Sequence, residues 1–193
     1  MHAQLLQLFK QIAPIDKIEE AKIVAAFKPY HLAKSSYFLK TGEVNKYIGF
    51  IRSGLVRYFV YKNETEATFE FTREGEFIAD YQSFSQHQPS IQNIQAIEDC
   101  ELLVINFEDV QDIFSHTPHG NLLGRVVIEH RFDVMVKQLL SIYMHKPEQR
   151  YFQFMASYAD LAQRIPLYMI ASYVGIQPES LSRMRRRLAK SSS

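Results

Sequence analysis

The change of hydrophobic periodicity near residue 105 constrains the fold of this chain more than any other feature. From Tyr30 to Ile105, short runs of β-branched and aromatic residues alternate with turn signals such as Ser53-Gly54 and Glu74-Gly75. About eight short strands are expected here, with a turn roughly every 8–12 residues. This spacing is typical of a jelly roll or small barrel. Helical periodicity follows, so the expected fold class is α+β.

A long helix is predicted from about Gly120 to His145, and Lys146-Pro147 ends it because proline disfavours helical geometry in the preceding residue. One set of its apolar residues, which includes Leu123 and Val127, can pack on the strands of the same chain. A second set has the alternating spacing of four and three that defines a heptad seam. This seam favours a coiled-coil dimer over packing on the chain's own barrel. Its residues are Ile128, Phe132, Met135, Leu139 and Ile142.

Residues 167–188 have the pattern of a helix-turn-helix. Ala171 supplies the small residue that the first helix needs where it meets the second, and Gly175 is the turn residue. Pro178 suits the first turn of the second helix, where its missing N–H costs nothing. The inward positions of that helix are Leu181, Met184 and Leu188. Its arginine-rich outer face can enter the major groove of DNA, and the alternative is a helical hairpin that only packs.

The distribution of charge supports a nucleic-acid partner although the total does not. The 193 residues carry a net charge of +1. Between Arg183 and Lys190 there are five basic residues and no acidic one, which concentrates positive potential there. A solvated basic tail is the alternative.

No apolar run approaches the roughly 18 residues that cross a bilayer, and the N-terminus lacks a signal-peptide pattern, so a cytoplasmic protein without a membrane partner is expected.

Motifs of catalysis and metal binding are missing from the sequence. The seven histidines are dispersed, and the nearest pair, His116 and His119, flanks a predicted turn. No Gly-x-Ser-x-Gly motif, phosphate-binding loop or Cys–His arrangement occurs. The single cysteine, Cys100, excludes an iron–sulfur sensor and is expected to be a buried structural thiol. We therefore expect neither an enzyme nor a resident metal or cofactor.

The sequence from Ile170 to Arg183, Ile-Ala-Ser-Tyr-Val-Gly-Ile-Gln-Pro-Glu-Ser-Leu-Ser-Arg, resembles the helix-turn-helix of the Crp/Fnr transcription regulators. Gly75-Glu76-Phe77-Ile78 resembles the Gly-Asp-Phe-Ile turn that leads into the cyclic-nucleotide pocket of that family. The resemblance covers nearly the whole chain. It implies a jelly-roll barrel of the cyclic-nucleotide-binding type over residues 1–117, a dimerisation helix over residues 118–146 and a helix-turn-helix DNA-binding domain over residues 147–193.

The same resemblance assigns roles on the second helix of the motif. It implies that Glu179 and Arg183 contact base edges, because the family uses these two positions for that purpose. Other polar residues of the helix are expected to contact the DNA backbone. They are Ser180, Ser182, Arg185, Arg186, Arg187 and Lys190. In the family a β-hairpin wing follows this helix, whereas the sequence stops at Ser193, so a domain without a full wing is expected.

The residues that hold cyclic AMP in the family have no counterpart here. Family members bind its phosphate through an arginine and its ribose through a glutamate, and the corresponding positions are Ser90 and Asp80. No lysine or arginine lies between Arg73 and Arg125 to replace the missing charge, and arginine is the side chain that holds a phosphate diester most strongly. Tight binding of cyclic AMP is therefore not expected. The degenerate pocket comprises Gly75, Glu76, Asp80, Ser90, Ile91, Met135 and Val136.

The function predicted from the sequence is that of a DNA-binding transcription regulator of the Crp/Fnr type, acting as a homodimer on a palindromic DNA site. An unknown small-molecule effector and RNA polymerase are left open as further partners. The alternative is an interaction or ligand-sensing module that does not bind DNA and carries a degenerate helix-turn-helix.

Overall fold

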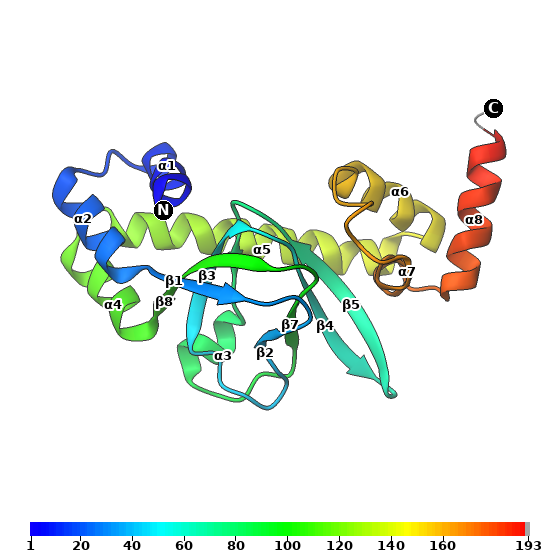
Figure 1. The fold of residues 1–193 in the computed structure, drawn as a ribbon, viewed down its shortest axis with the longest axis horizontal. Coiled ribbons are helices and arrows are strands. Elements are labelled where there is room, and N and C mark those ends of the chain that lie inside the picture. Colours follow the sequence, from blue (N-terminus) through cyan, green and yellow to red (C-terminus); the bar gives the residue numbers. More distant parts are fainter. Residues whose placement is uncertain (192–193) are drawn as a thin grey trace. The chain divides into compact units, whose positions relative to one another are not determined.

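The computed structural model describes residues 1–191, and of residues 189–191 only the backbone. The described chain contains eight helices and eight strands (Figure 1). It divides into two compact units. The first comprises Met1–Tyr58 and Phe71–Asp133, and the second comprises Phe59–Glu70 and the chain from Val134 onward. The domain boundaries predicted at residues 117 and 146 stay predictions.

The strand-rich part of the sequence forms two four-stranded sheets. The strands are β1 (Lys28–Leu32), β2 (Tyr37–Leu39), β3 (Tyr47–Ser53), β4 (Val56–Lys62), β5 (Thr65–Thr72), β6 (Phe77–Ile78), β7 (Asn93–Ala96) and β8 (Cys100–Asn106). One sheet has the order β1-β8-β3-β6, with β8 antiparallel to both neighbours, and the other has the order β2-β7-β4-β5. The jelly-roll prediction is confirmed, with the difference that the strands form two sheets and not one closed barrel.

The core of the first unit joins N-terminal helices to these strands. α1 (Ala3–Ile12) is amphipathic, and both α1 and α2 (Lys17–Ala26) bury apolar residues in that core, among them Leu5, Phe9 and Ile23. The ring of Phe9 stacks on Phe77 of β6 with centroids 6.1 Å apart. Burial of such aromatic side chains, at about 1.5–3 kcal/mol each, is what fixes the two helices to the strands.

Three helices follow within or at the end of this unit: α3 (Tyr81–Gln86), α4 (Phe107–His116) and α5 (Gly120–Met144). α5 was predicted, whereas α3 was not. Glu19 of α2 is buried and accepts hydrogen bonds from the backbone N–H and the Nδ1 of His119, both at 2.9 Å. This contact joins the first turn of α2 to the residue before α5, and α2 also lies beside α4 (Figure 1).

The second unit consists of C-terminal helices and the outer part of the β4–β5 hairpin. Its helices are the last part of α5, then α6 (Pro147–Tyr158), α7 (Leu167–Val174) and α8 (Pro178–Ser191). Phe154, Leu161 and Ala171 are fully buried in it, as is Leu181 of α8. The unit therefore has an apolar core of its own, and α7 and α8 are held in it as a pair.

Candidate nucleic-acid interface

The turn between α7 and α8 is closed by backbone hydrogen bonds around Gly175. The Gly175 N–H donates to the carbonyls of Ala171 and Ser172 at 2.9 and 3.1 Å, and the Ile176 N–H donates to the Ala171 carbonyl at 3.0 Å. This is the Schellman arrangement, which requires a left-handed residue, and Gly175 has a φ of +84°. The Gln177 carbonyl then accepts from the first N–H groups of α8. The structure thus contains the predicted helix-turn-helix.

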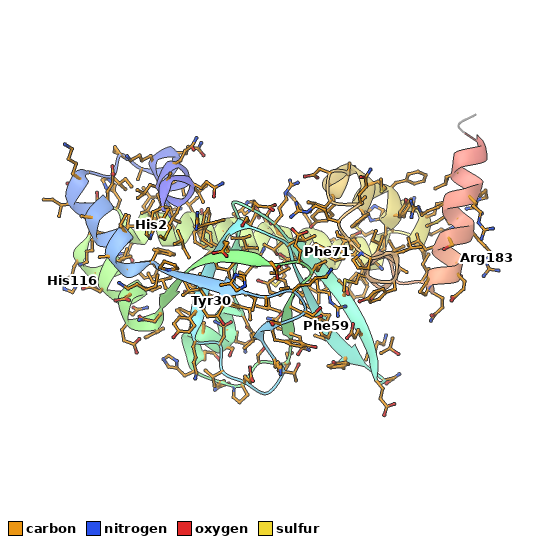
Figure 2. All side chains as sticks on the ribbon, in the orientation of Figure 1. His2, Tyr30, Phe59, Phe71, His116 and Arg183 are labelled. Atoms are coloured by element: carbon orange, nitrogen blue, oxygen red, sulfur yellow. The ribbon has the colours of Figure 1, made fainter. Side chains whose placement is uncertain are left out.

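The inner and outer faces of α8 agree with the prediction. Leu181 and Met184 are buried, and Leu188 is half-buried. Glu179 and Arg183, four residues apart and therefore on one face of the helix, are both exposed. The Arg183 side chain projects from the side of α8 turned away from α6 and α7 (Figure 2). The two positions expected to contact bases are therefore free of the core of their own unit.

The positions assigned to the DNA backbone have mixed surroundings. Arg185 and Arg186 are exposed, whereas Ser180 and Ser182 are half-buried. Arg187 forms an ion pair with Glu148 of α6, with Nη2 and Oε2 2.8 Å apart. Because both partners are exposed, the pair contributes only about 0.2–1 kcal/mol. The side chain of Lys190 lies outside the described residues.

Two residues that the sequence analysis did not single out contact the motif. Arg150 of α6 donates from Nη2 to the carbonyl of Tyr173 near the end of α7. Ser172 of α7 bonds to the β4–β5 hairpin: its Oγ accepts from the Thr68 N–H at 2.9 Å and donates to the Glu66 carbonyl at 2.7 Å. β5 is the last strand of its sheet. Ser172 therefore bonds to two backbone groups of β5 that a neighbouring strand would otherwise pair with.

The turn before the expected effector pocket has the geometry that the sequence predicts. Gly75, at a φ of +84°, donates its N–H to the Ile51 carbonyl at 2.8 Å, and Ile51 donates to the Glu76 carbonyl at 3.0 Å. These bonds tie the turn to β3. The chain then passes through β6 to Asp80, which accepts from the Ser83 N–H and so caps α3.

The two positions that would hold a cyclic nucleotide are bonded to each other. The Ser90 hydroxyl donates to Oδ2 of Asp80 at 2.7 Å, and both residues are buried. Oδ1 of Asp80 accepts from the Ser83 N–H at 3.2 Å, and the Asp80 N–H donates to Oδ1 of Asn45 at 3.2 Å. Buried carboxylates are stable only when their oxygens are satisfied in this way. Ser90, at the position expected for the phosphate-binding arginine, therefore offers a hydroxyl that is already bonded to the Asp80 side chain.

Three of the remaining pocket positions differ in exposure. Ile91 is 81% exposed although it directly follows Ser90. Met135 and Val136 belong to the part of α5 in the second unit, where Met135 is exposed and Val136 is half-buried.

The heptad seam of α5 is open in the single chain. Each of its five residues is exposed, from 38% for Ile128 to 59% for Phe132. Leu123, from the other apolar set, is buried in the core of the first unit, and Val127 packs partly against that core. The two sets therefore differ in their surroundings, and the role of the seam in a dimer stays a prediction.

Cys100 is fully buried, and burial raises its pKa to about 11, so it is a protonated structural thiol as expected. Within residues 1–191, no group of three histidine, cysteine, aspartate or glutamate residues is arranged to hold a metal ion. None of the helices described here has the length and apolar content needed to cross a membrane.

Comparisons with known proteins agree with this architecture. Residues 29–117 match the family model of the cyclic nucleotide-binding domain. FixK2 from Bradyrhizobium japonicum superposes with a TM-score of 0.75 at 13% identity, over 86% of this chain and 86% of that one. The c-di-GMP-responsive global regulator CLP from Xanthomonas campestris gives a TM-score of 0.73 at 15% identity, over 92% of this chain and 93% of its own.

A protein from Eubacterium rectale described as a transcriptional regulator of the Crp/Fnr family gives a TM-score of 0.68 at 17% identity, over 92% of this chain and 85% of its own. The sequence matched none of the curated proteins with which it was compared. Residues 29–117 therefore form a domain of the cyclic nucleotide-binding type. The chain has the fold of the Crp/Fnr transcription regulators, which confirms the resemblance seen in the sequence.

Proposed function

We propose that the protein is a dimeric, DNA-binding transcription regulator of the Crp/Fnr type, in which the outer face of α8 reads base edges. The observation that carries the proposal is the exposed pair Glu179 and Arg183 on a helix that begins directly after a closed helix-turn-helix turn. A helix of this kind enters the major groove with its N-terminal residues toward the bases. The neighbour from Eubacterium rectale is described as a transcriptional regulator, and the proposal assigns no catalytic residue.

The chemistry of the two side chains defines what each can read. Arg183 can donate two hydrogen bonds to O6 and N7 of a guanine, and Glu179 can accept one from N4 of a cytosine. Both side chains are exposed. Arg185, Arg186 and Arg187, with the half-buried Ser180 and Ser182, are assigned to phosphates, which give affinity but no sequence preference.

A second copy of this chain is the proposed partner along α5. The exposed seam runs along one side of the helix, and two such seams would bury each other's apolar residues. In a symmetric dimer the two copies of α8 would meet successive turns of the major groove, roughly 34 Å apart, on a palindromic site. Binding to chromosomal DNA implies a cytoplasmic location.

The test is a selection of bound sequences from random DNA, followed by titration of the selected duplex and a mixed-sequence duplex at two salt concentrations. Affinity should fall with salt, by a slope of about 0.9 per phosphate contact. Arg183→Ala should weaken the selected duplex by about 10–100-fold and the mixed duplex far less. Arg125→Ala, on an exposed residue of α5 paired with Glu129, is the control. A response that is flat with salt would favour a module that does not bind DNA.

We further propose that cyclic AMP is not the effector. The Asp80–Ser90 hydrogen bond supports this, since both side chains already satisfy each other where the nucleotide would need a glutamate and an arginine. Calorimetry of the purified protein should detect no saturation by cyclic AMP up to millimolar concentration. Saturation at or below that level would contradict the proposal. A different small-molecule effector, and contact with RNA polymerase, stay predictions from the sequence.

A further inference from the structure

We infer that Arg150 is a positioning residue for sequence reading, because its guanidinium fixes the turn from which α8 begins. The inference rests on the DNA-binding function proposed above. It concerns a residue of α6 that does not belong to the helix-turn-helix itself.

The contacts of Arg150 converge on the end of α7. Its backbone N–H bonds to the Lys146 carbonyl at 3.0 Å, which anchors it in the first turn of α6. Its Nη2 donates to the carbonyl of Tyr173, and its Nη1 lies only 3.0 Å from the point that a Cβ on Gly175 would occupy. The guanidinium therefore touches both the last turn of α7 and the residue that reverses the chain.

The Tyr173 carbonyl needs such a partner. At the end of a helix the last carbonyls have no N–H within the helix. The turn satisfies those of Ala171 and Ser172 through the N–H groups of Gly175 and Ile176. Arg150 supplies a donor there, and its positive charge stands at the negative end of the α7 dipole. A charged donor in a partly buried position forms a stronger bond than a neutral one.

The same face of α6 holds the Tyr173 side chain. Phe154 and Tyr158 follow Arg150 at intervals of four residues, and their rings lie 5.6 and 6.2 Å from the Tyr173 ring, measured between centroids. Burial lowers the pKa of Arg150 and raises that of Tyr173. One face of α6 thus contacts both the backbone and the ring of Tyr173 in α7.

The position of this contact determines the direction of α8. Only Ile176 and Gln177 separate Gly175 from Pro178, the first residue of α8. Arg183 lies five residues along that helix, about 8 Å further on. A change of about 10° at the turn would therefore move Arg183 by about 1 Å, which exceeds the tolerance of about 0.5 Å for a recognition group. The exposed Arg187–Glu148 pair is a second contact between α8 and α6, and it adds only about 0.2–1 kcal/mol to the apolar contacts of the buried Leu181 and Met184.

The experiment compares wild-type protein with Arg150→Met, which keeps the apolar stem, Arg150→Lys, which keeps a charged donor, and the control Arg125→Met on an exposed residue of α5. Dissociation constants are measured for the selected duplex and a mixed-sequence duplex at one salt concentration. Their ratio defines selectivity. Hydrogen exchange of the Gly175 and Ile176 amides is measured in parallel, because both N–H groups bond to the Ala171 carbonyl in the closed turn.

Arg150→Met should lower selectivity about tenfold, the size of one lost base contact, while affinity for the mixed duplex changes less than twofold. The two amides should exchange faster, Arg150→Lys should recover part of the selectivity, and Arg125→Met should match the wild type. Unchanged selectivity in folded Arg150→Met would overturn the inference and leave the proposed function intact. If Arg150→Met does not fold, Arg150→Lys decides: selectivity equal to that of the wild type overturns the inference. If the wild-type protein selects no DNA sequence, both the proposed function and this inference are refuted.

Discussion

The dimer proposed along α5 can be tested with two neighbouring leucines. Leu139 is a seam residue and is 52% exposed, whereas Leu140 lies outside the seam and is 49% exposed. Full burial of a leucine side chain stabilises by about 1.5–3 kcal/mol, so burial of the exposed half contributes about 1 kcal/mol. A symmetric dimer contains the residue twice. Leu139→Ala should therefore destabilise the dimer by about 2 kcal/mol and raise its dissociation constant about 30-fold.

Sedimentation equilibrium at several protein concentrations measures this constant directly. Leu140→Ala is the matched control, since it removes the same atoms from a side chain of nearly the same exposure on the adjacent position of the helix. It should change the dissociation constant less than about twofold, because it makes no contact across a heptad seam. Equal weakening by the two substitutions, or a wild-type protein that stays monomeric at micromolar concentration, would refute the assignment of this face.

Three further predictions concern stability. Ser172→Ala should lower the free energy of unfolding by about 2 kcal/mol in chemical denaturation, because two backbone groups of β5 lose their partner, whereas Ser172→Thr should lose less. Burial raises the pKa of Glu19, but hydrogen bonds from His119 outweigh this effect and leave the pKa below its usual value. The wild type should therefore lose stability as the pH falls below about 4. Glu19→Gln should lose less stability over that range. Gly120→Ala should lower the melting temperature, since its Cβ would lie 2.2 Å from the Ile113 carbonyl oxygen, and a melting temperature equal to the wild type would contradict that close approach.

Local patterns in the sequence predicted the parts of the fold that are built from local interactions. Gly175 and Pro178 mark the turn and the start of α8, and both signals act within a few residues. The strand-rich region was also predicted, from its runs of β-branched and aromatic residues. β1 was not delimited, because its five residues include a single buried one, Leu32, and so give no alternating pattern. α3 was missed because its start depends on Asp80 as a cap, which was considered only as a ligand position.

Contacts between distant parts of the chain could not be predicted in this way. Ser172 and Thr68 are 104 residues apart, and neither position has a composition that indicates the other. Arg150 looked like one polar residue among many on α6, and only the folded chain brings it beside Gly175. The Asp80–Ser90 pair could be predicted only in part. The sequence identified both positions as unsuited to a nucleotide, but their mutual hydrogen bond depends on how α3 returns the chain.

The bond between Ser172 and β5 has a consequence for solubility. An uncovered edge strand is a template on which another chain can add a strand, and proteins avoid this by covering or charging such edges. Here the cover is a side chain of α7, the helix that also supports α8. Loosening of α7 would therefore expose backbone donors and acceptors of β5 to other molecules. In variants that weaken this helix, self-association is expected to appear before any loss of secondary structure.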